Sequence, residues 1–218
     1  MITTSVSLSR LAREPIMQVS VDFSETPGYV CFPKLHPDFL GISTNCDFTG
    51  SIIVSSFAVL DVETTGLSAT QGDRVVEIAV VVLDEQFRVV RMFDSLVHPQ
   101  RSIPPRVTRI HGISNHDIQQ APTFADLLPD LMNCFAGTTH LVAHNISFDL
   151  GFLRAELLAC GVQMPRSFAH LCTMQMARRK RVASNAKLST VASALNIPAV
   201  ANAHRAIVDA GITARVLS

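Results

Sequence analysis

Two carboxylates stand one residue apart where the apolar run 57–60 ends. They are Asp61 and Glu63, and Thr64-Thr65-Gly66 follows them directly. Residues i and i+2 of a strand lie on the same face of a sheet, so both acids are expected to point into one site. Adjacent carboxylates repel each other unless a cation joins them, and Mg²⁺ and Mn²⁺ prefer carboxylate oxygen. On spacing alone, the commoner explanation is a pair of surface acids before a turn.

A third acid, Asp149, follows the apolar segment 141–143 and lies in a segment of helical periodicity. Phe152, Leu153, Glu156 and Leu157 continue the same spacing, so Asp149 is expected on or beside a buried helical stripe near the helix start. A buried acid needs a partner, which is either a metal ion or the unpaired amides of the first helical turn. Taken alone, capping of the helix is the commoner role.

The last acid of interest, Asp209, belongs to a final helix that is expected to reach about residue 217. His204 precedes it by five residues, and five steps of about 100° put the two side chains well apart on an ideal helix. For both to reach one site, His204 should lie in the loop before the helix, and residues 198–202 are a plausible loop. Alone, a histidine followed by an aspartate carries no functional signal.

Taken together, these residues resemble the DEDD exonuclease superfamily in its histidine-bearing branch. The sister branch has a tyrosine four residues before the last acid, and here that residue is Arg205. The chain is most similar to the proofreading (epsilon) subunit of bacterial DNA polymerase III and to the exonuclease domain of Gram-positive replicative polymerases. The resemblance covers roughly residues 56–217 and rests on four segments in the family order: Asp61-Val-Glu63-Thr-Thr-Gly66, Arg109-Ile-His111-Gly112-Ile113, Ala143-His144-Asn145-x-x-Phe148-Asp149 and His204-Arg-Ala-x-x-Asp209-Ala210.

The resemblance implies a metal-dependent 3′-5′ exonuclease with two divalent metal ions, Mg²⁺ or Mn²⁺. Two metals about 3.5–4 Å apart can activate a water and neutralise charge on the attacking and leaving oxygens. We expect Asp61 to bridge the metals and Asp149 to hold one of them, directly or through water. Glu63 and Asp209 are expected to support the metal that activates the water. His204 is the expected acceptor of the water's proton, since an unperturbed imidazole has a pKa of about 6.5.

The resemblance also implies a subsite for the terminal nucleotide beside the first motif. Leu67 is expected to be an apolar wedge against the last bases, and His111 is expected to be a turn or supporting residue rather than a ligand. For Phe148 a place in the core is an equally open alternative. The predicted substrate-binding residues are Thr64, Thr65, Gly66, Leu67, His144, Asn145 and Phe148.

The distribution of charge gives a further hint. The chain has 18 basic and 18 acidic residues, so it lacks the overall basic character of a tight, non-specific nucleic-acid binder. Between residues 157 and 208 there is no acid. A solvated surface explains this segment as well as a salt-sensitive contact with a nucleic-acid backbone does. Its basic residues are Arg166, Arg178, Arg179, Lys180, Arg181, Lys187 and Arg205.

The order of the expected elements indicates where these residues lie. Strands are expected at 57–62, 74–83, 88–97, 140–143 and 168–172, and helices at 103–110, 124–135, near 149–157, 174–180, 187–195 and in the final segment. Thr123 is the expected cap of the helix at 124–135. This order predicts an α/β fold with a central mixed five-stranded sheet flanked by helices, similar to the ribonuclease H-like fold.

The chain divides into an N-terminal extension of unknown role, residues 1–55, and an exonuclease domain, residues 56–218. No apolar stretch is long enough to span a membrane. The five cysteines are odd in number and form no C-x-x-C motif, which favours reduced thiols and a cytoplasmic setting. The extension is expected to pack on the domain or to contact a partner.

Three functions remain open from the sequence. The first is a DNA exonuclease that releases nucleoside monophosphates from 3′ ends, in proofreading or in repair and trimming. The second is a 3′-5′ RNA exonuclease, because the acids and metals do not distinguish the sugars. The third, a non-catalytic nucleic-acid-binding module, is disfavoured by the intact set of four acids and a histidine. The expected partner is a nucleic-acid 3′ end, preferably single-stranded DNA. Because the sequence ends directly after the last helix, we expect either that the N-terminal extension contacts a DNA polymerase or that the enzyme acts alone.

Overall fold

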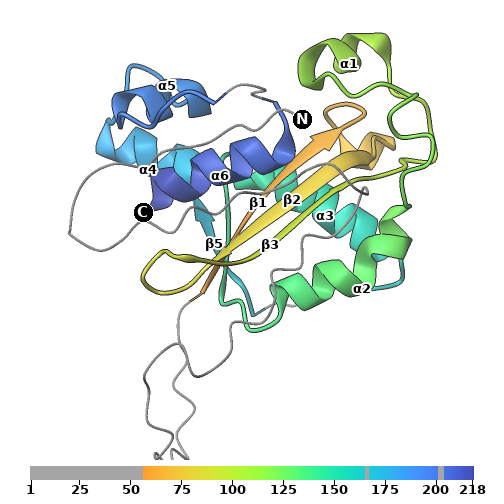
Figure 1. Ribbon diagram of the computed structural model, residues 1–218, viewed down its shortest axis with the longest axis horizontal. Coiled ribbons are helices and arrows are strands. Elements are labelled where there is room, and N and C mark those ends of the chain that lie inside the picture. Colours follow the sequence, from red (N-terminus) through yellow and green to blue (C-terminus); the bar gives the residue numbers. More distant parts are fainter. Residues whose placement is uncertain (1–55, 165–166, 201–203) are drawn as a thin grey trace, which may run out of the picture.

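The computed structural model describes residues 56–164, 167–200 and 204–218. The proposed extension at 1–55, Cys31, Cys46 and Arg166 lie outside these ranges. A central twisted sheet carries helices on both faces (Figure 1). No helix within the described ranges combines the length and apolar character needed to cross a membrane.

The sheet has five strands in the order β3-β2-β1-β4-β5. Strand β1 pairs with β2 antiparallel and with β4 parallel. The outer pairs follow the same division, with β2 and β3 antiparallel and β4 and β5 parallel, so the predicted mixed sheet is confirmed. The strands are β1 (Phe57–Thr64), β2 (Val75–Leu83), β3 (Val89–Leu96), β4 (His140–Ala143) and β5 (Ala169–Cys172).

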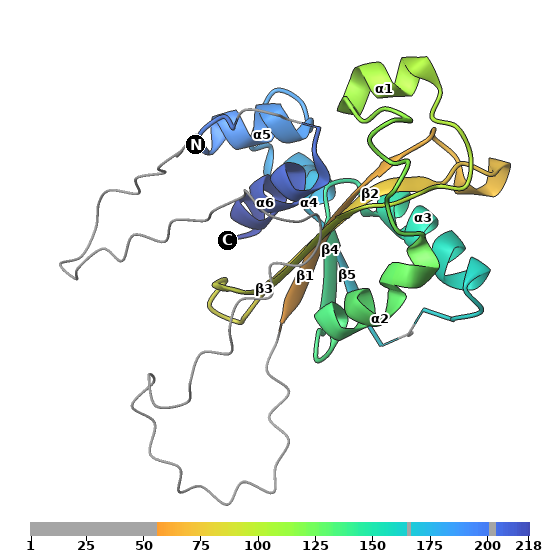
Figure 2. The same ribbon diagram turned by 45° about the vertical axis from the view of Figure 1, so that its right-hand side comes forward.

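Helices cover both faces of the sheet. Two of them, α2 and α3, pack on one face, while α6 packs on the other beside α4 and α5 (Figures 1 and 2). A short 3-10 helix, η2 (Ala69–Gln71), lies in the connection from β1 to β2. The α-helices are α1 (Pro105–His111), α2 (Phe124–Phe135), α3 (Ile146–Ala159), α4 (Thr173–Lys180), α5 (Leu188–Ala194) and α6 (Ala206–Leu217).

Helix α2 shows how local sequence determines an element. The backbone amide of Asp126 donates to the hydroxyl of Thr123, and the Asp126 carboxylate accepts from the amide of Thr123. This capping box satisfies two amides that the first helical turn leaves unpaired. The predicted cap and the predicted helix limits are both confirmed.

The two faces of the sheet are packed differently. Large side chains such as Leu60, Phe152 and Leu153 fill the layer between the sheet and helices α2 and α3. Helix α6 instead faces the sheet with alanines four residues apart, including Ala206 and Ala210. Small side chains allow the helix backbone to approach closely. The start of α6 therefore lies directly against β1 and β2, beside the strand that carries the first two acids.

Candidate active site

Asp61 and Glu63 both lie inside strand β1. The strand continues two residues beyond the predicted limit at residue 62, because pairing with β2 persists through Glu63 and its neighbour Glu77. The register then shifts between Glu63 and Thr64. Both acids are half-buried and, as predicted from their spacing, project on the same face of the sheet.

Asp149 lies in the first turn of α3 and is 3% exposed. The helix starts directly after β4, the parallel neighbour of β1, so its first turn lies at the same edge of the sheet as the end of β1. The predicted helical position on the buried stripe is confirmed. Because this carboxylate is buried, its charge needs a partner, which is either the amides of the first helical turn or a metal ion.

His204 lies two residues before α6, as predicted, and Asp209 lies in the first turn of that helix. The backbone of His204 has a φ of 70°, a left-handed conformation that is uncommon outside glycine. Its side chain is exposed, whereas Asp209 is half-buried. Ligand atoms of Glu63, His204 and Asp209 lie within 4.8 Å of one another.

Burial raises the pKa of all four carboxylates, and repulsion from the other acids raises those of Asp61 and Glu63 further. The pKa of Asp61 is raised by burial and then by Asp149, Asp209 and Glu63. Burial, followed by the charge of neighbouring Glu77, raises the pKa of Glu63 to about 8. Burial also raises the pKa of Asp149 to about 7 and raises that of Asp209. The four predicted acids are therefore brought together from three separate segments.

An array of this kind fits divalent cations. Carboxylates with pKa values raised by burial and by each other are unfavourable as anions unless a cation compensates them. Hard oxygen donors with a single imidazole nearby suit Mg²⁺ or Mn²⁺ better than softer metals. The donor set at this edge of the sheet is thus chemically suited to the predicted metals.

The connection after β1 forms an ordered turn. The hydroxyl of Thr65 donates to the Asp73 carboxylate at 3.2 Å, and the hydroxyl of Thr64 donates to the carbonyl oxygen of Gly66 at 2.5 Å. A β-carbon on Gly66 would collide with the carboxyl group of Asp73, so any other residue would have to displace this carboxylate from its hydrogen bonds with Thr65 and Ser68. Leu67 projects from this turn with 86% of its surface exposed. The first group of predicted substrate-binding residues therefore lies in one turn beside the acids.

In the second group of predicted substrate-binding residues, the side chains of His144 and Phe148 contact other parts of the protein. Both ring nitrogens of His144 are engaged, with the Thr173 hydroxyl at 2.9 Å and the Ala186 carbonyl oxygen at 2.8 Å. The ring of Phe148 packs on Phe152 with centroids 4.9 Å apart. Asn145 is exposed at the start of α3. These contacts leave Asn145 the most accessible polar group of the three and support the core alternative for Phe148.

Two ion pairs, each joining a buried glutamate to a partly exposed arginine, flank the site, and the sequence does not predict either of them. Glu156 on α3 accepts from Nε and Nη2 of Arg74 at 2.8 and 2.6 Å. Glu77 on β2 accepts from Nε and Nη2 of Arg205 at 2.8 and 2.5 Å. The available signal was a lone acid inside an apolar stretch, which needs a partner wherever it is buried.

His111 ends α1 and is 5% exposed. Its Nδ1 accepts from the amide of Ile113 at 3.0 Å, and Nε2 has no partner among the described residues. Burial lowers the pKa of this imidazole. The hydrogen bond agrees with the expected turn role.

The basic segment divides into two parts. Arg178, Arg179 and Lys180 form the exposed last turn of α4 and are available for contact with a phosphate backbone. Arg205 is committed to Glu77 and does not belong to that surface.

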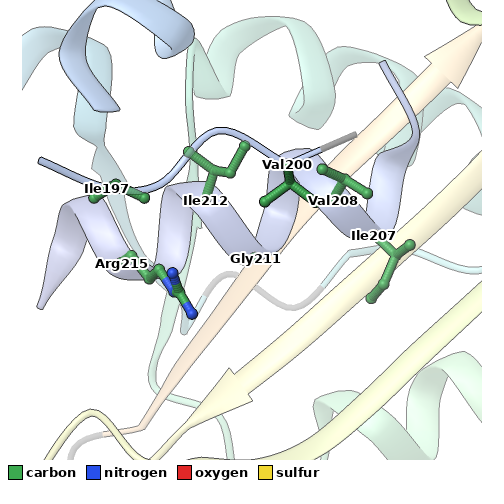
Figure 3. Close-up of a pocket in the computed structure, with 7 residues that line it drawn as sticks. All are labelled: Ile197, Val200, Ile207, Val208, Gly211, Ile212 and Arg215. Atoms are coloured by element: carbon green, nitrogen blue, oxygen red, sulfur yellow. The ribbon is translucent and has the colours of Figure 1, made fainter. Parts of the chain in front are cut away.

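An apolar pocket of about 200 Å³ lies on the outer side of α6 (Figure 3). It contains neither an acid nor a histidine, so it is separate from the candidate active site. Its lining residues are Ile197, Val200, Ile207, Val208, Gly211, Ile212 and Arg215.

Comparison with known proteins agrees with this geometry. Residues 58–217 match the family described as RNase_T exonuclease, and the chain therefore belongs to the exonuclease family. It is 40% identical over 123 residues to DNA polymerase III subunit epsilon of Treponema pallidum, covering 56% of this chain and 55% of the relative. It is 35% identical over 166 residues to the PolC-type DNA polymerase III of Clostridium perfringens, covering 74% of this chain and 11% of the relative. The chain thus spans only part of the length of these curated relatives.

Solved structures confirm the fold class. Exonuclease X in complex with 5′ overhanging duplex DNA is 30% identical, with a TM-score of 0.59 over 74% of this chain and 88% of that chain. Exonuclease I of E. coli in complex with a dT13 oligonucleotide has a TM-score of 0.66 over 75% of this chain and 40% of that chain. At 18% identity, the second likeness concerns the fold alone. The predicted ribonuclease H-like fold and membership of the exonuclease family are both confirmed.

Proposed function

We propose that this chain is a metal-dependent 3′-5′ exonuclease that releases nucleoside monophosphates from DNA 3′ ends. The observation that carries the proposal is the convergence of four carboxylates and one imidazole at one sheet edge. Membership of the exonuclease family supports the reaction class. The residues in this convergence are Asp61, Glu63, Asp149, Asp209 and His204.

The four acids would hold two divalent metal ions. When bound, such ions supply a Lewis acid that activates water and neutralise charge on the attacking and leaving oxygens. Asp61 is the natural shared ligand, because its pKa is raised by the charges of all three other acids. Glu63 and Asp209, whose oxygens lie close together, would share one ion, and Asp149 would hold the other.

His204 would accept the proton of the attacking water. Its ring lies with Glu63 and Asp209, where the water must be held, and an imidazole can take up a proton near neutral pH. The exposure of its side chain allows that proton to pass to solvent.

DNA is the substrate that the relatives support. One solved structure with 30% identity is a complex with duplex DNA, and the curated relatives include DNA polymerase III subunits. Leu67, exposed on the turn next to the acids, would pack against the terminal base, and the basic end of α4 would contact the phosphate backbone. The polymerase III relatives support a role in proofreading with a polymerase, and repair or trimming without a polymerase is the alternative role. RNA is the alternative substrate.

Digestion of 5′-labelled single-stranded DNA and RNA in the presence of Mg²⁺, Mn²⁺ or EDTA tests the proposal. We expect a ladder of DNA products shortened from the 3′ end, release of mononucleotides, and no reaction in EDTA. An oligonucleotide with a 3′-terminal phosphorothioate linkage should resist cleavage. Faster digestion of RNA would favour the alternative, and binding without cleavage in either metal would contradict the enzymatic proposal.

A further inference from the structure

Glu77 is a buried acid in the apolar strand β2 that is not one of the expected metal ligands. It is fully buried and lies opposite Glu63 in the register between β1 and β2. Both of its oxygens are occupied by donors. Oε1 accepts from Nε and Nη2 of Arg205, and Oε2 accepts from the backbone amide of Ala206 at 2.8 Å. These bonds leave it poorly placed to serve as a fifth metal ligand.

The donors to Glu77 come from the two residues that directly follow His204. His204 itself is exposed and has a left-handed backbone, a conformation that is unfavourable for a residue with a side chain. Such a conformation persists when its surroundings enforce it. The contacts at Arg205 and Ala206 fix the chain immediately after His204 to the central sheet.

We infer that Glu77 and Arg205 are positioning residues for catalysis, which hold the turn before α6 so that His204 stays beside Glu63 and Asp209. This inference rests on the proposed function. The pair touches neither the reacting water nor the substrate in this scheme. Its proposed effect on the reaction passes through the orientation of His204, and Arg205→Lys retains the positive charge that opposes Glu77 beside Glu63.

The pair Arg74–Glu156 is a matched comparison within the same molecule. Glu156 is also buried, also accepts from Nε and Nη2 of an arginine, and also accepts from the amide of the following residue, Val75. Both pairs join an arginine to a buried glutamate that also accepts a backbone amide. They differ in one detail, because Nε and Nη2 of Arg74 donate to separate oxygens of Glu156, whereas those of Arg205 both donate to Oε1 of Glu77. Only the pair on Glu77 is adjacent to His204. If both pairs only stabilise the fold, removing either arginine should affect activity in the same way. If the Glu77 pair positions His204, the effect of removing Arg205 should depend on His204, and the effect of removing Arg74 should not.

A double-mutant cycle with His204→Ala separates these roles. We expect Arg205→Ala to lower kcat about tenfold to a hundredfold, since a small misplacement of a catalytic group has effects of that size. KM should change less than about threefold, because substrate contacts are retained. Arg205→Lys, which keeps the charge but not the two-nitrogen contact, should recover part of the loss. In the His204→Ala background, Arg205→Ala should lower kcat further by less than about twofold.

Arg74→Ala is the control for this cycle. It should lower activity by the same factor with and without His204, because its pair acts elsewhere. If Arg205→Ala also lowers kcat by the same factor in both backgrounds, the positioning role is wrong. Wild-type protein that releases no nucleotide would overturn the proposed function and this inference together. If the wild type is active but Arg205→Ala and His204→Ala lower kcat independently of each other, the inference alone is overturned. Arg205→Lys keeps the test decisive if Arg205→Ala fails to fold.

Discussion

The two sides of the candidate site are built in different ways. On one side, Asp61 and Asp149 belong to β1 and α3, elements whose neighbouring side chains fill the main core. On the other side, His204 lies on an exposed turn, and the next residue, Arg205, binds buried Glu77. Asp61 and Asp149 are thus held by general packing, while the position of His204 depends on one specific contact. The two functions should therefore be separable by mutation.

The largest effect is expected on the core side. Asp61→Asn removes the charge that both metals would share, and turnover should fall about 10³-fold or more, because metal ions stabilise several kcal/mol of transition-state charge. Initial rates with Mg²⁺ and Mn²⁺ measure the loss. Asp130→Asn changes an exposed acid on α2 and should have no effect. An Asp61→Asn enzyme with more than a tenth of the wild-type rate would remove Asp61 from the proposed metal site.

A smaller and more selective effect is expected on the side of α6. His204→Ala should lower kcat about 10²-fold or more, as loss of a general base does, while KM and the Mg²⁺ concentration for half-maximal activity stay within about twofold. His170→Ala, at an exposed position on the edge strand β5, is the control. Equal activity of His204→Ala and wild type at pH 7.5 would exclude the residue from the mechanism. A tenfold shift in the Mg²⁺ requirement would instead make His204 a ligand together with Glu63 and Asp209.

The stability of the protein should also depend on the protonation of the four acids. In metal-free protein the pKa values of the four acids lie above their unfolded values, that of Glu63 at about 8. The folded state then binds more protons than the unfolded state between about pH 4.5 and 8, so the free energy of unfolding decreases as pH rises through this range. Melting temperatures in EDTA should fall accordingly, by about 2–4 °C for each kcal/mol lost.

Divalent metal should reverse this loss, with a larger rise in melting temperature at pH 8 than at pH 5.5. Glu63→Gln, which removes one of the acids, should make the decline in EDTA shallower. Scanning calorimetry across the pH range measures both. Melting temperatures that are independent of pH and of Mg²⁺ and Mn²⁺ would contradict the electrostatic description of the site.

Features encoded by neighbouring residues could be predicted from the sequence. The limits of α2 follow from its periodicity and from Thr123, and the loop position of His204 follows from the helical angle to Asp209. The end of β1 was placed two residues early, because the apolar pattern stops at Val62 while backbone pairing continues. Pairing of that kind depends on the partner strand and leaves no trace in the apolar pattern.

Contacts between distant residues could not be predicted. Arg74 and Glu156 are 82 residues apart in sequence, and Arg205 and Glu77 are 128 apart. A buried acid in an apolar stretch indicates that a partner is needed, but sequence spacing does not identify that partner. Likewise, the family resemblance predicts that His144 shapes the substrate pocket but does not indicate that both of its ring nitrogens bind the protein.

The smallest expected effect concerns Leu67, which belongs to neither side of this comparison. Its side chain is 86% exposed and contributes little to the core, so Leu67→Ala should leave the melting temperature unchanged. If a terminal base packs on it, the apolar area lost should raise KM for single-stranded DNA about threefold to tenfold, with kcat nearly unchanged. Leu158→Ala, at an exposed leucine on α3, is the matched control and should leave KM unaltered. A similar KM for both variants would mean that the terminal base does not contact Leu67. The ordered turn around Asp73 would then have only the structural role of supporting the end of β1.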